Sequence, residues 1–503
     1  MTGVQLLAYA DRFGGDLAGV RALLTRGPLA VFSGVHLLPF FVPFDGDDAG
    51  FDPVDHGRVD PRLGTWQDVA ALAEAGIDVT ADLIVNHVSA SSAEFTDWLQ
   101  HTDSDHDGMF LTFDTVFPGG ASEADVTAFY RPRLGLPFTP YQRADGSRRL
   151  VWTTFMPSQV DLDVAHPAAQ DYLRRTLRTL AAGGVRTVRL DAVGYAVKTR
   201  GTDSFMTPQT LDFVREITAT AHAEGLRVLV EVHAHHTQQQ AVAPLVDLVY
   251  DFALPPLLLH SLATGTVDRL AHWLAIRPAN AVTVLDTHDG IGVIDAGPSG
   301  DLPGLLSTAE MAAIFERAAV LTGGVSAQAS AQVAWAGLPH QINATSFSVH
   351  GRDETAYLIA RAVQLFVPGE PQIYYVGLLA GTDDVALWQS TGAGRDVNRH
   401  RFTPAEIDLA VRTEVVRALL ALIRLRSSHP ALGGTFSWAS PSTSCLVMGW
   451  IHGEHRIELR VVTDPVAPAF ELGWTEGDAF RTARSAADLV EPRGPGSGHS
   501  GRP

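Results

Sequence analysis

The chain has 503 residues, a formal net charge of −19 at pH 7 and 46% hydrophobic residues. This length is too great for one small core and predicts a large catalytic domain with smaller parts attached to it. The negative charge argues against binding to nucleic acid or anionic membranes, and no segment has the ~18 unbroken apolar residues that a membrane helix requires.

The ends of the chain and its cysteine content bear on location. The start, MTGVQLLAYADRF, lacks the basic and apolar regions of a signal peptide. Cys445 is the single cysteine, so no intrachain disulfide can form, as is typical of a reducing compartment. We therefore expect a cytoplasmic protein. The tail EPRGPGSGHSGRP, residues 491–503, is rich in Gly, Pro and Ser and is expected to be disordered.

Short β-rich runs recur along the chain with helical stretches between most of them. The runs that predict strands are residues 5–9, 30–38, 78–87, 185–193, 226–234, 247–252, 281–289 and 372–376. Periodic or alanine-rich stretches that predict helices include residues 66–75, 167–182, 208–224 and 353–366. Alternation of strand and helix implies a parallel sheet, and eight such units predict a (β/α)8 TIM barrel.

Two connections between the predicted strands are too long for simple loops. Residues 88–165, rich in Asp, Gly, Pro and aromatic residues, are expected to form an inserted domain after the third strand. Residues 290–351 are expected to form a smaller insertion after the seventh strand, and this insertion carries the acceptor loop. The barrel itself would then comprise residues 1–87, 166–289 and 352–430.

The last part of the chain changes its pattern. An amphipathic helix is predicted at residues 411–428, and the sequence then alternates between apolar and polar residues at 446–451 and 457–462. This alternation predicts a small antiparallel β-domain over residues 431–490.

Polar residues stand where the predicted strands end and the loops begin, which is where barrels of this kind carry their catalytic groups. Arg189 and Asp191 end the fourth strand, and they point to the same side because they are two residues apart. Glu231 lies at the end of the fifth strand and Asp289 at the end of the seventh. We expect these three carboxylates to meet in one pocket.

The simpler interpretations of these residues are structural. A single aspartate at the end of a strand is more often a cap or a turn residue, and Arg189 with Asp191 would by themselves fit an ion pair. Three carboxylates at three strand ends favour retaining glycoside chemistry instead. One carboxylate attacks the anomeric carbon, a second protonates the leaving oxygen and a third stabilises the transition state. Arg189 is expected to keep Asp191 ionised, because an adjacent cation lowers the pKa of a carboxyl group.

Several longer segments carry a specific family resemblance. DLIVNH, VRLDAVGY, LVEVH and LDTHDG, in this order, resemble the four signature segments of the α-amylase superfamily. Within it the chain is most similar to the sucrose phosphorylase family, through FDGDDAGFDPVDH, MFLTFDTVFPGGA, YRPRLGLPFTPY, YDFALPPLLLH, THDGIGVID and GRDVNRH. The resemblance extends from residue 1 to about residue 430 and is weaker beyond.

The resemblance implies a role for each candidate residue. Asp191 would be the nucleophile, Glu231 the general acid/base and Asp289 the stabiliser of the transition state. The glucosyl ring would be bound by Asp48, His87, Arg189, His288 and Arg395, with Phe51, Phe155 and Tyr195 as hydrophobic platforms. The acceptor and phosphate side would be lined by Tyr130, Arg131, Arg133, His233, His340 and Gln341.

The implied activity is phosphorolysis of sucrose to α-D-glucose 1-phosphate and fructose through a covalent glucosyl–enzyme. The partners would be a sugar donor and inorganic phosphate, with no cofactor or metal, and the family pattern allows for a homodimer. Phosphate must attack the ester in place of water, which requires positive charge on the leaving-group side. Arg131 and Arg133 are the candidates for this charge, and surface ion pairs are the alternative role for both.

The acceptor loop departs from the family pattern. Leu338-Pro339-His340 stands before Gln341, where the family carries Asp-Leu-Tyr. Leu338 removes a negative charge, and His340 adds a group that can be cationic near neutral pH. The donor could therefore be sucrose, sucrose 6′-phosphate or a compound of the glucosyl-glycerol or glycerate type. A hydrolase or transglucosidase on the same barrel is a further alternative. A non-catalytic barrel is disfavoured because all three carboxylates are present.

Overall fold

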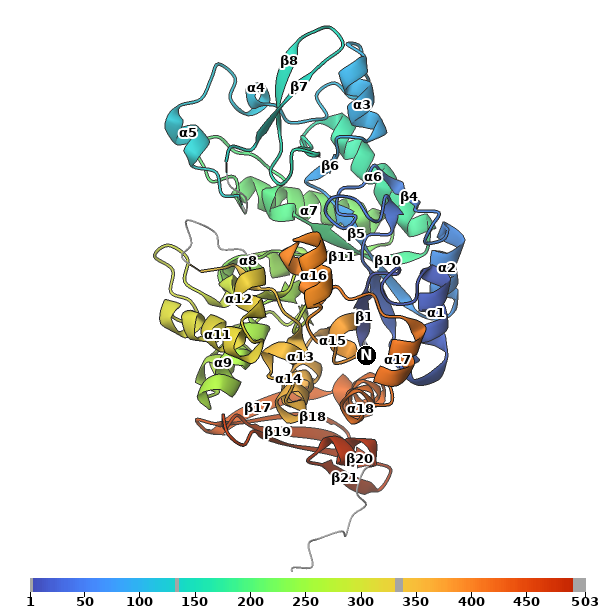
Figure 1. Cartoon of the computed structure of the whole chain (residues 1–503), viewed down its shortest axis with the longest axis vertical. Coiled ribbons are helices and arrows are strands. Elements are labelled where there is room, and N and C mark those ends of the chain that lie inside the picture. The colour runs from blue at the N-terminus through green and yellow to red at the C-terminus, as the bar shows by residue number, and fades with distance from the viewer. Residues whose placement is uncertain (1–2, 132–134, 331–337, 492–503) are drawn as a thin grey trace, which may run out of the picture.

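A computed structural model of the chain describes residues 3–131, 135–330 and 338–491. Its centre is a closed barrel of parallel strands in chain order, in which the last strand pairs with the first (Figure 1). The strands are β1 Gln5–Ala8, β2 Gly34–Leu37, β5 Asp78–Ile84, β10 Val185–Asp191, β11 Arg227–Val230, β12 Leu248–Asp251, β13 Ala281–Thr283 and β16 Glu370–Tyr374. This arrangement confirms the predicted TIM barrel.

Several strands begin or end at other residues than predicted. Residues 30–33 form a turn that follows the 3-10 turn η1 Gly27–Leu29, and β2 itself begins at Gly34. β13 ends at Thr283, so Asp289 lies six residues into the following loop. Glu231 likewise stands one residue after β11. The loops, and not the strand ends alone, therefore position two of the three carboxylates.

The predicted barrel helices are present with nearly the predicted bounds. They are α2 Trp66–Glu74, α6 Pro167–Ala182, α7 Pro208–Ala223 and α14 Glu354–Phe366. Further helices on the barrel are α1 Leu17–Thr25, α8 His236–Val242, α9 Leu254–Thr264, α10 Asp268–Ile276 and α18 Glu414–Ser428. The start of α2 follows from a capping box between Thr65 and Asp68, and α6 and α7 have proline in the first turn, where no backbone donor is lost.

Between β5 and α6 the chain leaves the barrel and builds one end of the molecule, at the top of Figure 1. Its elements are β6 His87–Ser89, α3 Ala93–Gln100, α4 Phe113–Val116, α5 Glu123–Thr127, β7 Phe138–Gln142, β8 Arg148–Trp152 and β9 Gln159–Asp161. β6 and β9 pair antiparallel, which brings the start and the end of this excursion side by side. Phe117 and Trp152 form part of a separate apolar cluster there. The limits of this segment as a domain stay a prediction.

The segment between β13 and α14 brings the acceptor loop back to the barrel. It contains β14 Ile291–Gly292, η4 Ile294–Ala296, α11 Thr308–Leu321, α12 Val325–Ala329, β15 Gln341–Ile342 and α13 Ser346–Val349. β14 and β15 pair antiparallel, with Gly292 opposite Gln341. After β16 follow α15 Tyr375–Leu378, α16 Val385–Thr391, η5 Gly394–Asn398 and α17 Pro404–Ala410. The position of residues 290–351 as a separate insertion stays a prediction.

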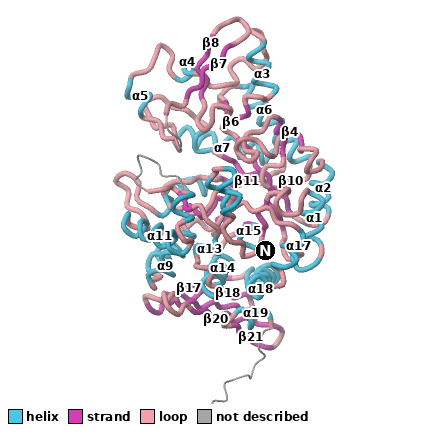
Figure 2. Tube along the Cα trace, in the orientation of Figure 1, coloured by secondary structure: helices cyan, strands magenta, loops and turns pink. Residues whose placement is uncertain are grey.

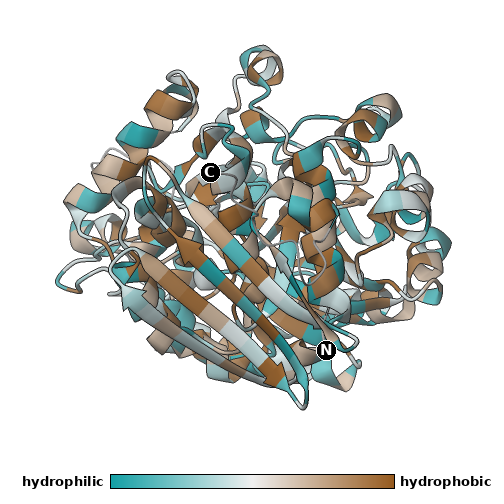
Figure 3. Ribbon diagram, turned by 90° about the horizontal axis from the view of Figure 1, so that it is seen from below, coloured by the Kyte–Doolittle hydropathy of each residue, from teal (hydrophilic) through white to brown (hydrophobic). Residues whose placement is uncertain are grey.

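A five-stranded antiparallel sheet follows α18 and confirms the predicted C-terminal β-structure. Its strands are β17 Thr435–Ser442, β18 Cys445–His452, β19 His455–Val462, β20 Ala469–Glu476 and β21 Ala479–Ala483, and helix α19 Ala486–Val490 follows. Figure 2 shows these strands at the opposite end of the molecule from β7 and β8. Seen from below in Figure 3, hydrophobic and hydrophilic residues alternate along the strands that face the viewer.

The sheet is held against the barrel by its apolar face. Leu446, Met448 and Leu459 are buried in the same cluster as the barrel core, and Trp450 Nε1 donates a hydrogen bond of 2.7 Å to the carbonyl of Phe366 in α14. The predicted disordered tail lies, from residue 492 onward, outside the described residues. Within the described ranges, no helix combines the length and the apolar character needed to cross a membrane.

Candidate active site

Arg189 links the predicted nucleophile to the predicted acid/base. Arg189 Nη1 lies 3.0 Å from Asp191 Oδ1, and Nη2 lies 2.7 Å from Glu231 Oε1. Nη1 also contacts Asp82, which stands beside Arg189 on the neighbouring strand β5. The Arg189 side chain is only 2% exposed. The parallel pairing of β5, β10 and β11 therefore places one buried cation among three carboxylates.

The turn after β10 fixes the direction of Asp191. Ala192, the next residue, has a φ of 54°, and the 3-10 turn η2 Val193–Tyr195 follows it. A left-handed conformation at a residue other than glycine is uncommon and is found preferentially at functional sites. It ends the strand immediately after Asp191, so Arg189 and Asp191 are the last pair of β10 side chains on that face.

The expectation that Arg189 holds the pKa of Asp191 low is wrong for the net effect. Burial raises the pKa of Asp191 well above its usual range; Arg189 acts in the opposite direction, and the negative charges of Glu231 and Asp82 add to the rise. The physical reason is first the burial of Asp191, and second that the Arg189 charge is shared among three carboxylates. Its stabilisation of the Asp191 carboxylate is therefore divided.

Asp289 lies in a different electrostatic environment. Its Oδ1 is 2.7 Å from Arg395 Nη1 and 3.8 Å from Arg399 Nη2, and His288 Nε2 is 3.6 Å from its Oδ2. Burial alone would raise the pKa of Asp289, but Arg395, His288 and Arg399 hold it well below the usual range. Asp289 is thus ionised at any pH at which the protein would act, as a stabiliser of positive charge must be.

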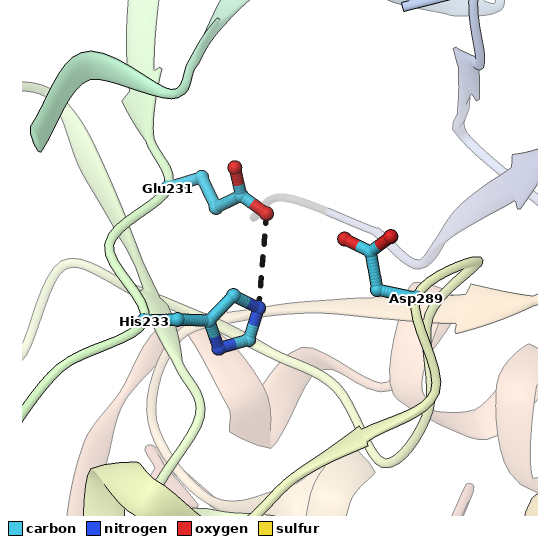
Figure 4. Close-up of side chains that lie close together, drawn as sticks. All are labelled: Glu231, His233 and Asp289. Atoms are coloured by element: carbon cyan, nitrogen blue, oxygen red, sulfur yellow. Dashed lines mark ion pairs between the residues drawn. The ribbon is translucent and has the colours of Figure 1, made fainter. Parts of the chain in front are cut away.

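The acid/base candidate and Asp289 face each other across a small space (Figure 4). His233, two residues after Glu231, lies beneath them, and its Nε2 is 3.7 Å from Glu231 Oε1. One ligand atom from each of these three residues lies within 4.8 Å of the others, a spacing that a metal ion can bridge. Arg189 and Arg395 already pair with the two carboxylates, so we assign no metal here. His235 points elsewhere, to Thr237 and the carbonyl of Pro303.

Several of the residues predicted to bind the glucosyl ring contact one another. Phe51 stacks on His288, with ring centroids 4.8 Å apart and planes 8° from parallel, and the Arg189 guanidinium lies 5.6 Å from the Phe51 ring. Asp48 accepts a hydrogen bond of 3.3 Å from Gln159 Nε2, which fixes its carboxylate beside Phe51. An apolar ring next to carboxylates and an arginine is the combination that sugar faces and hydroxyls require.

His87 and the two other predicted platforms, Phe155 and Tyr195, form a second set of contacts. The ring centroid of Phe155 is 5.3 Å from that of His87 and 5.2 Å from that of Tyr195. His87 Nε2 donates to the carbonyl of Phe51 at 2.9 Å, and Nδ1 accepts from Asn86 Nδ2 at 3.3 Å. Both ring nitrogens of His87 are therefore occupied by the protein, which favours a positioning role for this residue.

The predicted acceptor side comes together from three segments of the chain. The Tyr130 ring stacks against Tyr195 with centroids 6.2 Å apart, and against His340 with centroids 6.4 Å apart. The carbonyl of His340 accepts from the backbone amides of Val293 and Ile294. Gln341 follows in β15. The acceptor loop is thus attached directly to the loop that carries Asp289.

Arg131, the first arginine of YRPR, is held by backbone carbonyls. Arg131 donates to the backbone carbonyls of Thr154, Gly135 and Phe155 at 3.2, 2.9 and 3.3 Å. These contacts tie Arg131 to the residues that follow β8. Arg133 lies outside the described residues.

The expectation that His340 carries positive charge near neutral pH is wrong. Burial lowers the pKa of His340, and the nearby His233 lowers it further. The pKa of His233 moves the other way. Burial lowers it, but the carboxylate of Asp295, with Oδ2 3.3 Å from His233 Nδ1, more than compensates, so the pKa is raised. Of the two histidines on this side, His233 is therefore the one whose pKa is raised.

Sequence reasoning noted Asp82 within DLIVNH without giving it a role, and it missed three charged residues of the site: Lys198, Asp295 and Arg399. Lys198 Nζ is 2.7 Å from Asp161 Oδ2 and 2.9 Å from Asn86 Oδ1, so it joins the base of the β6–β9 pair to the residue before His87. Asp295 and Arg399 lie within THDGIGVID and GRDVNRH, and both segments had been singled out. The sequence pattern contained both residues but could not show which side chains they contact in the folded protein.

Comparison with known proteins agrees with this geometry. A family model described as alpha amylase, catalytic domain, matches residues 8–259. A sucrose phosphorylase from Agrobacterium vitis is 49% identical over 450 residues, covering 89% of this chain and 92% of the relative. A sucrose phosphorylase from Bifidobacterium adolescentis is 47% identical over 453 residues, covering 89% of each chain. This chain belongs to the sucrose phosphorylase branch of the alpha-amylase family.

A solved structure extends the agreement within this family to three dimensions. The crystal structure of a sucrose 6F-phosphate phosphorylase from Thermoanaerobacter thermosaccharolyticum matches with a TM-score of 0.88 and 34% identity. The match covers 96% of this chain and 97% of that chain, so it includes the C-terminal sheet, where the sequence resemblance had been weaker. The predicted family and fold are thereby confirmed.

Proposed function

We propose that the chain is a retaining glucosyl phosphorylase that converts sucrose and phosphate into α-D-glucose 1-phosphate and fructose. The observation that carries this proposal is the contact of Arg189 with both Asp191 and Glu231, opposite an Asp289 held ionised by Arg395. It is supported by the sucrose phosphorylases that are 49% and 47% identical to the chain.

The site provides for a double displacement with retention. In the first step Asp191 attacks the anomeric carbon, while Glu231 gives its proton to the fructosyl oxygen as the glycosidic bond breaks. Asp289, with its pKa held low, stabilises the oxocarbenium-like transition state. In the second step Glu231, now a base, takes a proton from phosphate, whose oxygen attacks the anomeric carbon and releases Asp191.

The direct test is to incubate the protein with sucrose, with and without phosphate, and to measure glucose 1-phosphate and free glucose. We expect donor cleavage that depends on phosphate, with the α anomer of glucose 1-phosphate seen by NMR. Cleavage to free glucose at the same rate without phosphate would favour the hydrolase or transglucosidase alternative. The β anomer would exclude the double displacement.

A second candidate donor, sucrose 6′-phosphate, is favoured by the replacement of the family's aspartate by Leu338 and by the function of the matching crystal structure. Against it stands the lowered pKa of His340, which leaves this residue neutral near pH 7. We therefore favour sucrose. The test is kcat/KM for both donors in the wild type and in His340→Tyr. A wild-type preference for the phosphorylated donor that His340→Tyr abolishes would reverse this choice.

We also propose that the enzyme acts in the cytoplasm, on the basis of its single cysteine and its family, and that it needs no cofactor. A homodimer stays a prediction that sedimentation of the purified protein can test. A donor of the glucosyl-glycerol or glycerate type is less favoured, because the relatives at 49% and 47% identity act, by their names, on sucrose.

A further inference from the structure

Asp295 is a fully buried carboxylate that the catalytic steps above do not use. It lies in η4, in the loop that follows Asp289. Its Oδ2 is 3.3 Å from His233 Nδ1, and its Oδ1 accepts from the backbone amide of Ala234 and from Gln239 Nε2, each at 3.1 Å. Asp295 thus ties the loop after β13 to the loop that carries Glu231 and His233.

These contacts fix the orientation of the His233 ring. Because a carboxylate only accepts, His233 Nδ1 carries the proton in its contact with Asp295. The ring also stacks on Phe252, with centroids 3.9 Å apart and planes 19° from parallel, which prevents it from turning. Nε2 therefore points into the space between Glu231 and Asp289 (Figure 4), where it is buried and has no hydrogen-bond partner among the described residues.

Two histidines face the predicted acceptor side, and one of them, His233, lies against Asp295, a carboxylate that pairs with no arginine or lysine among the described residues. The charged groups around His233 are Asp295, Glu231 and Asp289, of which the last two already pair with arginines. His340 is faced by His233 and, with a weaker influence, by Asp295. The raised pKa of His233 and the lowered pKa of His340 both follow from this arrangement.

We propose that Asp295 is a positioning residue that directs a proton to His233 rather than to His340, so that Nε2–H of His233 meets the phosphate that attacks the glucosyl ester. The inference rests on the proposed phosphorylase function. A charge-assisted donor is worth more to an anion than to a neutral sugar. Fructose, as leaving group, gains little from the charge, so Asp295 should distinguish phosphate from fructose and from water.

The test variant is Asp295→Asn. The asparagine keeps an acceptor for Ala234, but its amide can face His233 Nδ1 as a donor, which leaves His233 neutral. We expect KM for phosphate to rise by about tenfold or more, as for the loss of one charge-assisted hydrogen bond. KM for sucrose and the hydrolysis of α-glucosyl fluoride without phosphate should change by less than about twofold, because neither needs the charge.

The matched control is Asp247→Asn. Asp247 Oδ2 makes a similar contact of 2.8 Å with His222 Nε2 and also accepts from a backbone amide, but it precedes β12, at the end of the barrel away from the three carboxylates. This control should leave KM for phosphate unchanged. If it raised KM for phosphate as much as Asp295→Asn, the effect would be one of general stability, and the positioning role would be wrong.

A second readout does not depend on activity. Histidine side-chain NMR titrations, assigned with His233→Gln and His340→Gln, should show His233 holding its proton to higher pH than His340 in the wild type, and the difference lost in Asp295→Asn. An unchanged His233 titration in that variant would overturn the inference. If the wild type made no glucose 1-phosphate, the proposed function would fail while this titration still tested Asp295.

If circular dichroism shows that Asp295→Asn does not fold, the variant His233→Gln tests the proposal instead. It keeps a neutral donor near the position of Nε2 and removes the charge. We expect the same rise in KM for phosphate as in Asp295→Asn. A wild-type KM for phosphate in His233→Gln would contradict the inference.

Discussion

At the scale of single residues, charge is distributed unequally among the three carboxylates to which we assign catalytic roles. Arg189 is divided among Asp191, Glu231 and Asp82, whereas Asp289 has Arg395 to itself and Arg399 nearby. Pairs of carboxylates whose pKa values are moved apart are the usual basis of divided catalytic roles. The carboxylate with the lowered pKa is Asp289, the proposed stabiliser, and the two that Arg189 bridges are the proposed nucleophile and the proposed acid/base.

Asp191→Asn should remove the nucleophile. We expect kcat to fall at least ~10³-fold, because an amide cannot form the glucosyl ester. The overall fold should survive, since the amide can still contact Arg189. Steady-state phosphorolysis rates of the variant and the wild type measure this loss. To detect the ester itself, the wild type is incubated with α-glucosyl fluoride, denatured and analysed by mass spectrometry. Turnover near the wild-type rate would remove Asp191 from this role.

Glu231→Gln should separate the two steps. Without an acid, donors with poor leaving groups such as sucrose should be cleaved slowly, while α-glucosyl fluoride, which needs little protonation, should react almost normally. Azide, an anion that needs no deprotonation, should restore the second step and yield glucosyl azide. An equal loss on both donors, with no rescue by azide, would show that Glu231 has another role.

At the scale of elements, the loops after the barrel strands position the side chains of the site, and the C-terminal sheet packs against the opposite end of the barrel. The β14–β15 pair connects the acceptor loop to the loop of Asp289, and η5 brings Arg395 and Arg399 to the same carboxylate. Helix α14 is buried along almost its whole length because it lies between the barrel and the C-terminal sheet. The sheet therefore contributes to stability and is remote from the chemistry.

Leu459→Ala in β19 should test this division. Leu459 is 1% exposed within the core cluster, and truncation of a buried leucine costs about 2–5 kcal/mol of unfolding free energy. Ile451→Ala in β18 is the matched control, because that side chain is 56% exposed and should cost well under ~1 kcal/mol. Urea unfolding measures both. We expect kcat at 25 °C to be unchanged in both variants, and a selective loss of kcat in Leu459→Ala would contradict the assignment.

At the scale of the whole molecule, buried ion pairs connect the barrel, and they predict how it responds to acid. Arg189 with Asp82 joins β10 to β5, Arg277 with Asp251 joins the end of α10 to β12, and Arg361 with Asp286 joins α14 to the loop after β13. Each pair stabilises the fold only while its carboxylate is ionised.

Acid should therefore weaken the barrel in a defined range of pH. Burial raises the pKa of Asp82, but Arg189 and His36 together lower it from the ordinary 3.8 to about 2. A carboxyl group with a lowered folded-state pKa contributes stability that is complete above its unfolded pKa and is lost as pH falls through the folded value. We expect Asp82 to account for about 2 kcal/mol of the loss in unfolding free energy between about pH 4 and pH 2.

The measurement is urea unfolding at steps of pH in the wild type and in Asp82→Asn. The variant should be less stable throughout, because Arg189 loses a buried partner, and its stability should fall less steeply below pH 4. Equal slopes for the two proteins in this range would show that Asp82 is not a source of the acid sensitivity.

The sequence by itself determined the barrel, the family and the candidate carboxylates. Alternation of strands and helices identifies a parallel barrel because each period is set by local geometry, 2 residues in a strand and 3.6 in a helix. Arg189 and Asp191 share one face for the same local reason, and LDTHDG and LVEVH carry Asp289 and Glu231. Nothing in these inferences required knowledge of which strands are neighbours.

Only the tertiary structure decided how charge is distributed among those residues. The pKa of a buried group depends on its partners in space, and Asp82 is 107 residues from Arg189, while Asp295 is 62 residues from His233. For this reason the expected lowering of the pKa of Asp191 and the expected positive charge on His340 were both wrong. Sequence patterns report which face a side chain occupies, but the sign of its pKa shift follows from burial and from contacts made across the barrel.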